Sequence, residues 1–141
     1  MARPVHTHLV MCTMKRVLIA EDDPGNAVLL RQALTERLDV AADVVANGAL
    51  VMDWVAAHRP DLLILDVGLP GLNGLDVFDL LRGDPNLEGV PVLFLTGLPE
   101  RAETANSATG VHEILAKPFD IEDLIARAAR LMGGAKSEIA A

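Results

Sequence analysis

Residues 62–74 read LLILDVGLPGLNG, and this stretch decides the fold. Leu62–Asp66 is apolar without alternation up to its closing aspartate, which is typical of a strand covered by helices on both faces. A loop rich in glycine and proline follows. Gly74–Arg82 then places Val77, Phe78 and Leu81 at helical spacing. The stretch therefore predicts a buried parallel strand, a loop and a helix that packs back on the sheet.

The same alternation of strand and helix extends in both directions from Lys15 onward, as in repeated βαβ units. The expected strands are Arg16–Ala20, Ala42–Ala46, Leu62–Asp66, Val90–Thr96 and Glu113–Leu115. We predict an α/β, doubly wound, three-layer sandwich with a five-stranded parallel sheet. With the first strand central, the strand order is 2-1-3-4-5.

Five helices are expected around this sheet. The first has Asp23 as its cap, Pro24 in its first turn and an apolar stripe of Ala27, Leu30, Leu34 and Leu38. The second and third span Ala49–His58 and Gly74–Arg82. The fourth, Pro99–Thr109, offers only alanines as its stripe, so we expect it to be held loosely.

The last helix shows the cleanest period, with Ile121, Leu124, Ile125, Ala128 and Leu131 on one face. Asp120 is its expected N-cap, and Asp123 would complete an acidic variant of the capping box. We assign Trp54, Phe78, Phe94 and Phe119 to the core, and His58 and His112 to the surface.

Length and composition narrow the function classes. The chain has 141 residues and a net charge of −8, which allows one domain of ordinary size and argues against nucleic acid as a partner. The expected domain covers residues 15–133, between a disordered leader at 1–14 and a short tail at 134–141. The single cysteine, Cys12, favours a reducing, cytoplasmic location, and no apolar run is long enough to span a membrane.

Chemically active side chains gather at the carboxyl ends of the predicted strands, where ligands bind in open parallel sheets. Glu21 and Asp22 follow the first strand, Asp66 ends the third, Thr96 ends the fourth and Lys117 follows the fifth. Three neighbouring carboxylates repel one another unless a cation lies among them, and Mg²⁺ suits such a site best. Cation, hydroxyl and ammonium would together stabilise a phosphoryl group moving onto a carboxylate nucleophile.

Four stretches carry a family resemblance: VLIAEDDP at 17–24, LLILDVGLPGLNG at 62–74, PVLFLTG at 91–97 and ILAKPF at 114–119. In this order and at these distances they resemble the receiver domain of two-component response regulators, a flavodoxin-like, CheY-like fold. The resemblance covers about residues 15–132.

The resemblance implies a role for each matching residue. Asp66 would be the phosphoacceptor, Asp22 a direct Mg²⁺ ligand, Glu21 a ligand through water and Gly68 a ligand through its main-chain carbonyl. Thr96 and Lys117 would bind the phosphoryl oxygens, and Pro118 would follow a cis peptide bond.

The resemblance also implies partner proteins, and two alternative functions stay open. A stand-alone phosphoprotein of this kind, not a conventional enzyme, would take its phosphoryl group from a histidine kinase. It would then contact a target protein or pass the group to a histidine phosphotransfer protein, and dimerisation through helix four, strand five and helix five stays open. The alternatives are a pseudo-receiver that acts as a binding scaffold and an aspartyl-phosphate hydrolase of the haloacid dehalogenase type.

Two positions depart from the family pattern. Ile114 stands where active receivers usually carry an aromatic ring, which puts aromatic-coupled switching in doubt. Gly68 and Leu98, which flank the route of the attacking water in the family, have no polar side chain to orient it. We therefore expect slow self-dephosphorylation.

Overall fold

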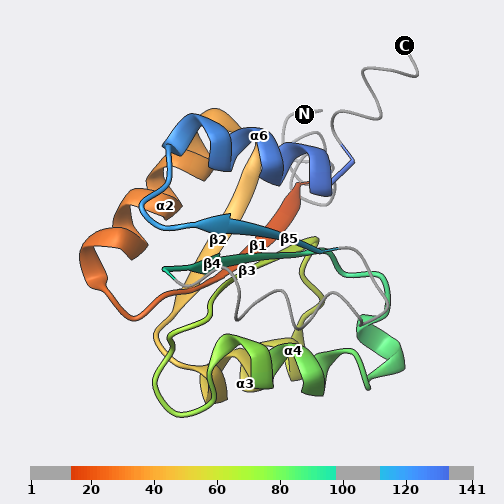
Figure 1. The fold of residues 1–141 in the computed structure, drawn as a ribbon. Coiled ribbons are helices and arrows are strands. Elements are labelled where there is room, and N and C mark those ends of the chain that lie inside the picture. Colours follow the sequence, from red (N-terminus) through yellow and green to blue (C-terminus); the bar gives the residue numbers. More distant parts are fainter. Residues whose placement is uncertain (1–13, 98–111, 134–141) are drawn as a thin grey trace, which may run out of the picture.

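The computed structural model describes residues 14–97 and 112–133 (Figure 1). The elements run in the order β1 (Lys15–Ala20), α2 (Pro24–Arg37), β2 (Val40–Val45), α3 (Gly48–Ala57), β3 (Leu62–Asp66), α4 (Gly74–Leu81), η1 (Pro85–Leu87, a 3₁₀ turn), β4 (Val92–Thr96), β5 (His112–Ala116) and α6 (Ile121–Leu131). The predicted fourth helix, Pro99–Thr109, lies outside the described residues, as do the leader and the tail.

The five strands form one parallel sheet in the order β2-β1-β3-β4-β5, which confirms the predicted topology. The order reverses between β1 and β3, so the ends of these two strands lie side by side. In register, Ala20 pairs with Leu65 and Asp66 pairs with Leu95. The residues that follow β1 are therefore held next to the end of β3.

Helices cover both faces of the sheet and give three layers (Figure 1). On the α2 and α6 face, the core includes Ile19, Leu30, Leu34, Ile64, Leu93 and Leu124. On the α3 and α4 face, it includes Leu18, Val51, Leu65, Val77, Phe78 and Phe94. Because successive side chains of a strand point to opposite faces, the non-alternating apolar runs of β1, β3 and β4 supply both cores.

Polar side chains begin each of the four described α-helices by accepting backbone N–H groups that the first turn leaves unpaired. The caps are Asp23 for α2, Asn47 for α3, Asn73 for α4 and Asp120 for α6. The predictions for Asp23 and Asp120 are confirmed. The Asp123 carboxylate, expected to complete the capping box, instead accepts from Arg127 Nε at 3.1 Å, one helical turn further on.

The other differences are local. β4 begins at Val92 and not at Val90, because Pro91 has no N–H to donate to the ladder and uses only its carbonyl, which accepts from Leu63 N at 3.0 Å.

Within residues 14–97 and 112–133, no helix has the length and apolar character of a membrane span.

Three side-chain predictions were wrong in part. His112, predicted at the surface, packs its ring edge-on against Phe78 and Phe94, with centroids 5.6 and 5.9 Å away. Trp54, predicted in the core, is half-buried, and its indole N–H donates to Asp43 Oδ2 at 3.0 Å. Phe119 is likewise half-buried, against the α2 and α6 core. Phe78 and Phe94 are buried as predicted.

Candidate phosphoacceptor site

Three carboxylates meet where β1 and β3 end. Glu21, Asp22 and Asp66 each place one carboxylate oxygen within 4.8 Å of the others. Glu21 is 2% exposed and Asp66 is 6% exposed, whereas Asp22 faces solvent. The sheet thus holds two buried acids and one accessible acid together, as the sequence predicted from the order of the strands.

Lys117 reaches these acids from the end of β5. Its Nζ lies 2.7 Å from Asp66 Oδ2 and 3.5 Å from Glu21 Oε1. The backbone N–H of Lys117 donates to the Thr96 carbonyl at 2.8 Å, which fixes the start of the turn beside β4. The Lys117–Pro118 peptide bond is cis, as the resemblance implied.

Backbone groups fix the orientation of both buried acids. Asp66 Oδ1 accepts from the N–H of Gly68 at 2.9 Å, and Glu21 Oε2 accepts from the N–H of Asp23 at 3.1 Å. Gly74 lies so close to the acceptor strand that a Cβ there would be 2.8 Å from the Asp66 carbonyl oxygen. The Asp66 loop therefore packs against the first residue of α4, where a side chain would not fit.

Burial and charge act together on the pKa values of Glu21 and Lys117. Burial raises the pKa of Glu21, and the neighbouring Asp66 charge raises it further, against the lowering effects of the Asp23 N–H and Lys117. For Lys117, burial alone would lower the pKa. The hydrogen bond and the charge of Asp66 more than compensate, so the pKa of Lys117 is raised and its ammonium stays charged.

The donor set fits a hard divalent cation. Three carboxylates face one ammonium, so negative charge is in excess, and burial together with the Asp66 charge raises the pKa of Glu21. Carboxylate oxygens with one ligand open to water suit Mg²⁺, which keeps several of its waters. Glu21, Asp22 and Asp66 could hold the ion, with the Gly68 carbonyl close by in the acceptor loop.

A cavity of about 380 Å³ opens beside Asp66 and is lined in part by Gly68, Thr96, Gly97 and Lys117. The structure thus brings the predicted phosphoryl-binding residues to one space, with Thr96 itself buried at 4% exposure. Leu98 lies outside the described residues.

Sequence reasoning missed Asn73 and Leu75, which line the same cavity. The available signal was the position of Asn73 directly before α4, where a cap residue is expected. As the N-cap of α4, Asn73 uses its Oδ1 to accept from the N–H groups of Leu75 and Asp76.

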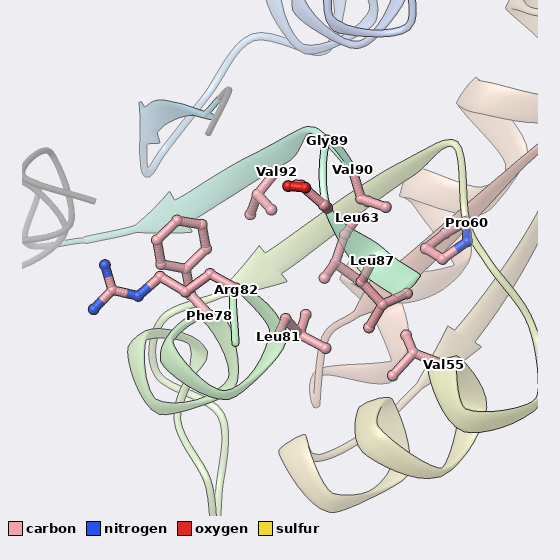
Figure 2. Close-up of a pocket in the computed structure, with 11 residues that line it drawn as sticks. Val55, Pro60, Leu63, Phe78, Leu81, Arg82, Leu87, Gly89, Val90 and Val92 are labelled. Atoms are coloured by element: carbon pink, nitrogen blue, oxygen red, sulfur yellow. The ribbon is translucent and has the colours of Figure 1, made fainter. Parts of the chain in front are cut away.

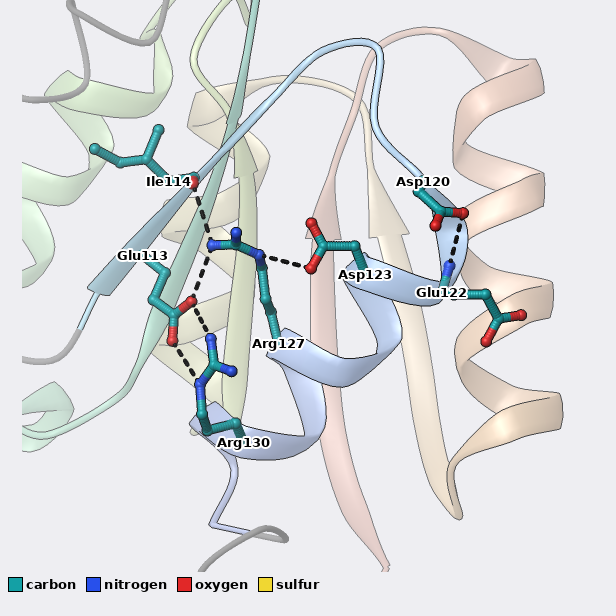
Figure 3. Close-up of polar contacts among 7 residues, drawn as sticks. All are labelled: Glu113, Ile114, Asp120, Glu122, Asp123, Arg127 and Arg130. Atoms are coloured by element: carbon teal, nitrogen blue, oxygen red, sulfur yellow. Dashed lines mark hydrogen bonds and ion pairs between the residues drawn. The ribbon is translucent and has the colours of Figure 1, made fainter.

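Beyond the acid cluster, an ion-pair network ties β5 to α6 (Figure 3). The Glu113 carboxylate accepts from both Arg127 and Arg130, at 3.2 and 2.6 Å. Arg127 also donates to Asp123 and to the Ile114 carbonyl. The Ile114 side chain is half-buried and packs toward the α3 and α4 core. β5, which leads directly into Lys117, is therefore fixed to α6 on one side and to the core on the other.

A doubly wound sheet with clustered acids, a buried threonine and a lysine at its carboxyl edge defines a phosphoacceptor class of signalling domain. Residues 17–129 match the response regulator receiver domain family, and the chain belongs to that family.

Individual relatives agree with this assignment. The DNA-binding response regulator MtrA of Mycolicibacterium smegmatis is 38% identical over 120 residues, which cover 83% of this chain and 50% of MtrA. The chain spans about half the length of the curated relatives it matches.

Among the solved structures that match at 26% identity, two were determined with magnesium. The receiver domain of the sensor histidine kinase PA1611 from Pseudomonas aeruginosa, with magnesium coordinated in its active-site cleft, has a TM-score of 0.75, and the match covers 86% of this chain and 99% of that one. TrrA from Thermotoga maritima, in complex with Mg²⁺ and BeF, has a TM-score of 0.72, with 84% and 99% covered.

Proposed function

We propose that this receiver domain accepts a phosphoryl group on Asp66 from the phosphohistidine of a histidine kinase, with Mg²⁺ at Glu21, Asp22, Asp66 and the Gly68 carbonyl. One observation carries the proposal. Lys117 Nζ contacts the Asp66 carboxylate at 2.7 Å inside a cluster of three acids, so the nucleophile and a charge-neutralising donor already lie together.

In the proposed reaction an Asp66 carboxylate oxygen attacks phosphorus. The P–N bond of the donor breaks, and its electron pair stays on the imidazole nitrogen. Because the acyl phosphate leaves Asp66 without its carboxylate charge, the Lys117 ammonium then turns to a phosphoryl oxygen. Thr96, at the end of β4, lies on the same cavity and supplies a hydroxyl to the group.

Bound Mg²⁺ would supply further positive charge against the phosphoryl oxygens. The chain's own share is to fix the acids before the donor arrives. The N–H groups of Gly68 and Asp23 orient Asp66 and Glu21, and the sheet register holds the two strand ends together.

The output we propose is protein contact in the cytoplasm, either with a target or as a relay to a phosphotransfer histidine. The expectation that nucleic acid is not a partner is not supported by the relatives, because MtrA is named a DNA-binding response regulator and this chain matches half of it. We therefore restrict the proposal to the protein partners of the receiver domain.

The proposal is tested by the mass of the intact protein after incubation with acetyl phosphate, with and without Mg²⁺. Wild type should gain one phosphoryl group only when Mg²⁺ is present, and Asp66→Asn should gain none. Asp23→Asn is the matched control, because Asp23 caps α2 and asparagine caps equally well. It should be phosphorylated like wild type.

Other outcomes point to the alternatives. A folded wild type that forms no adduct would indicate a pseudo-receiver scaffold, the reading that Ile114 favours. Turnover of small phosphate esters would indicate a hydrolase of the haloacid dehalogenase type. Gly68 argues against this alternative, because that family carries a second acid two residues after its nucleophile. With a labelled phosphoryl group, transfer of the label from Asp66 to a phosphotransfer histidine would identify a relay. If the label stays on Asp66 while a partner binds, the domain is a direct effector.

A further inference from the structure

A second cavity, of about 270 Å³, lies near the first residues of β3 and β4 (Figure 2), whereas Asp66 is the last residue of β3. It is formed between α3, α4, η1 and the first residues of β3 and β4. Its walls include the side chains of Val55, Leu63, Phe78, Leu81, Leu87 and Val92. No part of the proposed phosphoryl transfer uses these residues.

The walls belong to the core and not to the outer surface. Leu63, Phe78, Leu81, Leu87 and Val92 are each at most 8% exposed although they face this space. The lining also includes the half-buried Val55 and Val90, so the cavity is apolar at its base and open to solvent at its rim. Arg82, Glu88 and Gly89 are among the residues at that rim.

The rim is held in place by polar contacts. Arg59 Nη1 donates to the Asn86 carbonyl at 2.6 Å, and its Nη2 donates to the Glu88 carbonyl at 3.0 Å. Asp84 begins η1 by accepting from the N–H of Asn86 at 2.9 Å. The chain turns at Gly89 with a φ of +86°, which glycine adopts freely. The cavity is therefore preformed, as small-molecule sites usually are.

We propose that this cavity binds a compact, uncharged, apolar ligand built on one or two rings. An apolar cavity of about 150 Å³ stays dry and takes up benzene, so the larger space here holds a ring with several further atoms. The charged residues among its lining, Arg82 and Glu88, have opposite signs, and Arg82 is already paired with Asp79 at 3.2 Å. The apolar base of the cavity therefore offers a charged ligand no partner, and a ligand anion would compete with Asp79 for Arg82.

This inference goes beyond the proposed phosphoryl transfer and does not depend on it. Leu63 stands three residues before Asp66 on β3, which is about 10 Å along a strand. A ligand in the cavity would touch neither the acid cluster nor Lys117. Phosphorylation can therefore fail while ligand binding holds, and the reverse is equally possible.

The test is titration of the full chain with indole, followed through methyl resonances in two-dimensional NMR spectra. The expected result is saturable shifts confined to the methyl groups of the cavity, chiefly those of Leu63, Leu81, Leu87 and Val92. Indole-3-acetate, which adds a carboxylate, should bind at least tenfold more weakly. Equal affinity for the two compounds would contradict an uncharged ligand class.

Two filling variants complete the test. Val55→Phe, from α3, and Val90→Phe, at the rim, should each weaken indole binding at least tenfold. The control Val28→Phe, on α2 at a position 63% exposed, should bind like wild type. If Val55→Phe does not fold, Val90→Phe carries the test. Absence of shifts in wild type, shifts outside the cavity, or unchanged binding in the folded filling variants would overturn the proposal.

Discussion

Lys117 Nζ lies 2.7 Å from Asp66 Oδ2, although the two residues are 51 positions apart in the sequence. The contact joins the ends of β3 and β5. β4 separates these strands in the sheet, and Lys117 extends past it to reach the acid. The contact gives the buried Asp66 carboxylate a counter-charge before any phosphoryl donor arrives. It also places a fixed positive charge beside the expected cation.

Replacing Lys117 with methionine should separate metal binding from phosphorylation. Loss of the ammonium removes a charge that repels the cation, so Mg²⁺ should bind severalfold more tightly. The same loss removes a donor to the phosphoryl oxygens, so phosphorylation by acetyl phosphate should slow by roughly 100-fold. Mg²⁺ titration and rates of adduct formation check the two effects, and a change of both in the same direction would contradict the assigned role.

Mg²⁺ should stabilise the folded chain. A ligand that binds only the folded state at 100 times its dissociation constant adds about 2.7 kcal/mol to the free energy of unfolding. Urea denaturation with Mg²⁺ or with a chelator measures this gain. Asp22→Asn, at an exposed proposed ligand, should lose most of the gain that Mg²⁺ gives over the chelated protein, whereas Asp23→Asn should retain it.

Gly74→Ala should damage the acceptor loop. The added Cβ would lie 2.8 Å from the Asp66 carbonyl oxygen, and relief of that overlap requires a backbone shift. We expect a loss of about 1–3 kcal/mol in the free energy of unfolding, together with slower phosphorylation. Gly83→Ala is the matched control, because its Cβ would meet the Leu80 carbonyl oxygen at an ordinary 3.6 Å. Equal effects of the two substitutions would argue against a special packing at Gly74.

A surface ion pair between α2 and α6 should give a pH-dependent contribution to stability. Arg37 Nη1 donates to Glu122 Oε2 at 2.6 Å, and this bond lowers the pKa of Glu122 below its usual 4.5. Because the folded state binds the proton more weakly, the stabilisation is present above the unfolded pKa and is lost as pH falls through the lowered folded value. Glu122→Gln should therefore be slightly less stable than wild type at pH 7, and the difference should shrink as pH falls below 4.5. A difference that does not shrink with falling pH would point to another cause.

The lifetime of the phosphorylated form should depend on position 68. Gly68 offers no polar side chain near the acyl phosphate, and an added Cβ there would lie 3.6 Å from Asp66 Oδ1, which is an ordinary contact. Gly68→Asn should shorten the lifetime severalfold by orienting water. Phosphate release after removal of the donor measures it. Loss of the wild-type phosphoryl group within seconds would contradict the expected slow hydrolysis.

The sequence was sufficient for most of the sheet and for the acid cluster. A run such as Leu62–Asp66 can be stable only when covered on both faces, and the order of parallel strands then determines which strand ends meet. With the first strand taken as central, that topology brings together the side chains of Glu21, Asp22, Asp66, Thr96 and Lys117. Their individual roles come from the family resemblance.

The sequence was insufficient where a tertiary contact determines the environment of a side chain. The ring of His112 is amphipathic, and only the position of Phe78 on α4, beside Phe94, makes it a packing residue. The Asp123 carboxylate had two possible partners nearby in the sequence, the N-terminal turn of α6 and Arg127. The local sequence pattern does not indicate which of the two is preferred. The second cavity likewise depends on how α3, α4 and η1 pack, which no single segment encodes.

The most direct test of the central claim is the position of the phosphoryl group. Protein phosphorylated by acetyl phosphate in Mg²⁺ would be reduced with borohydride, which converts an acyl phosphate to an alcohol, and its peptides would be analysed by mass spectrometry. We predict homoserine at position 66, dependent on Mg²⁺ and absent from Lys117→Met at short times. Modification at any other carboxylate, with Asp66 intact, would contradict the account.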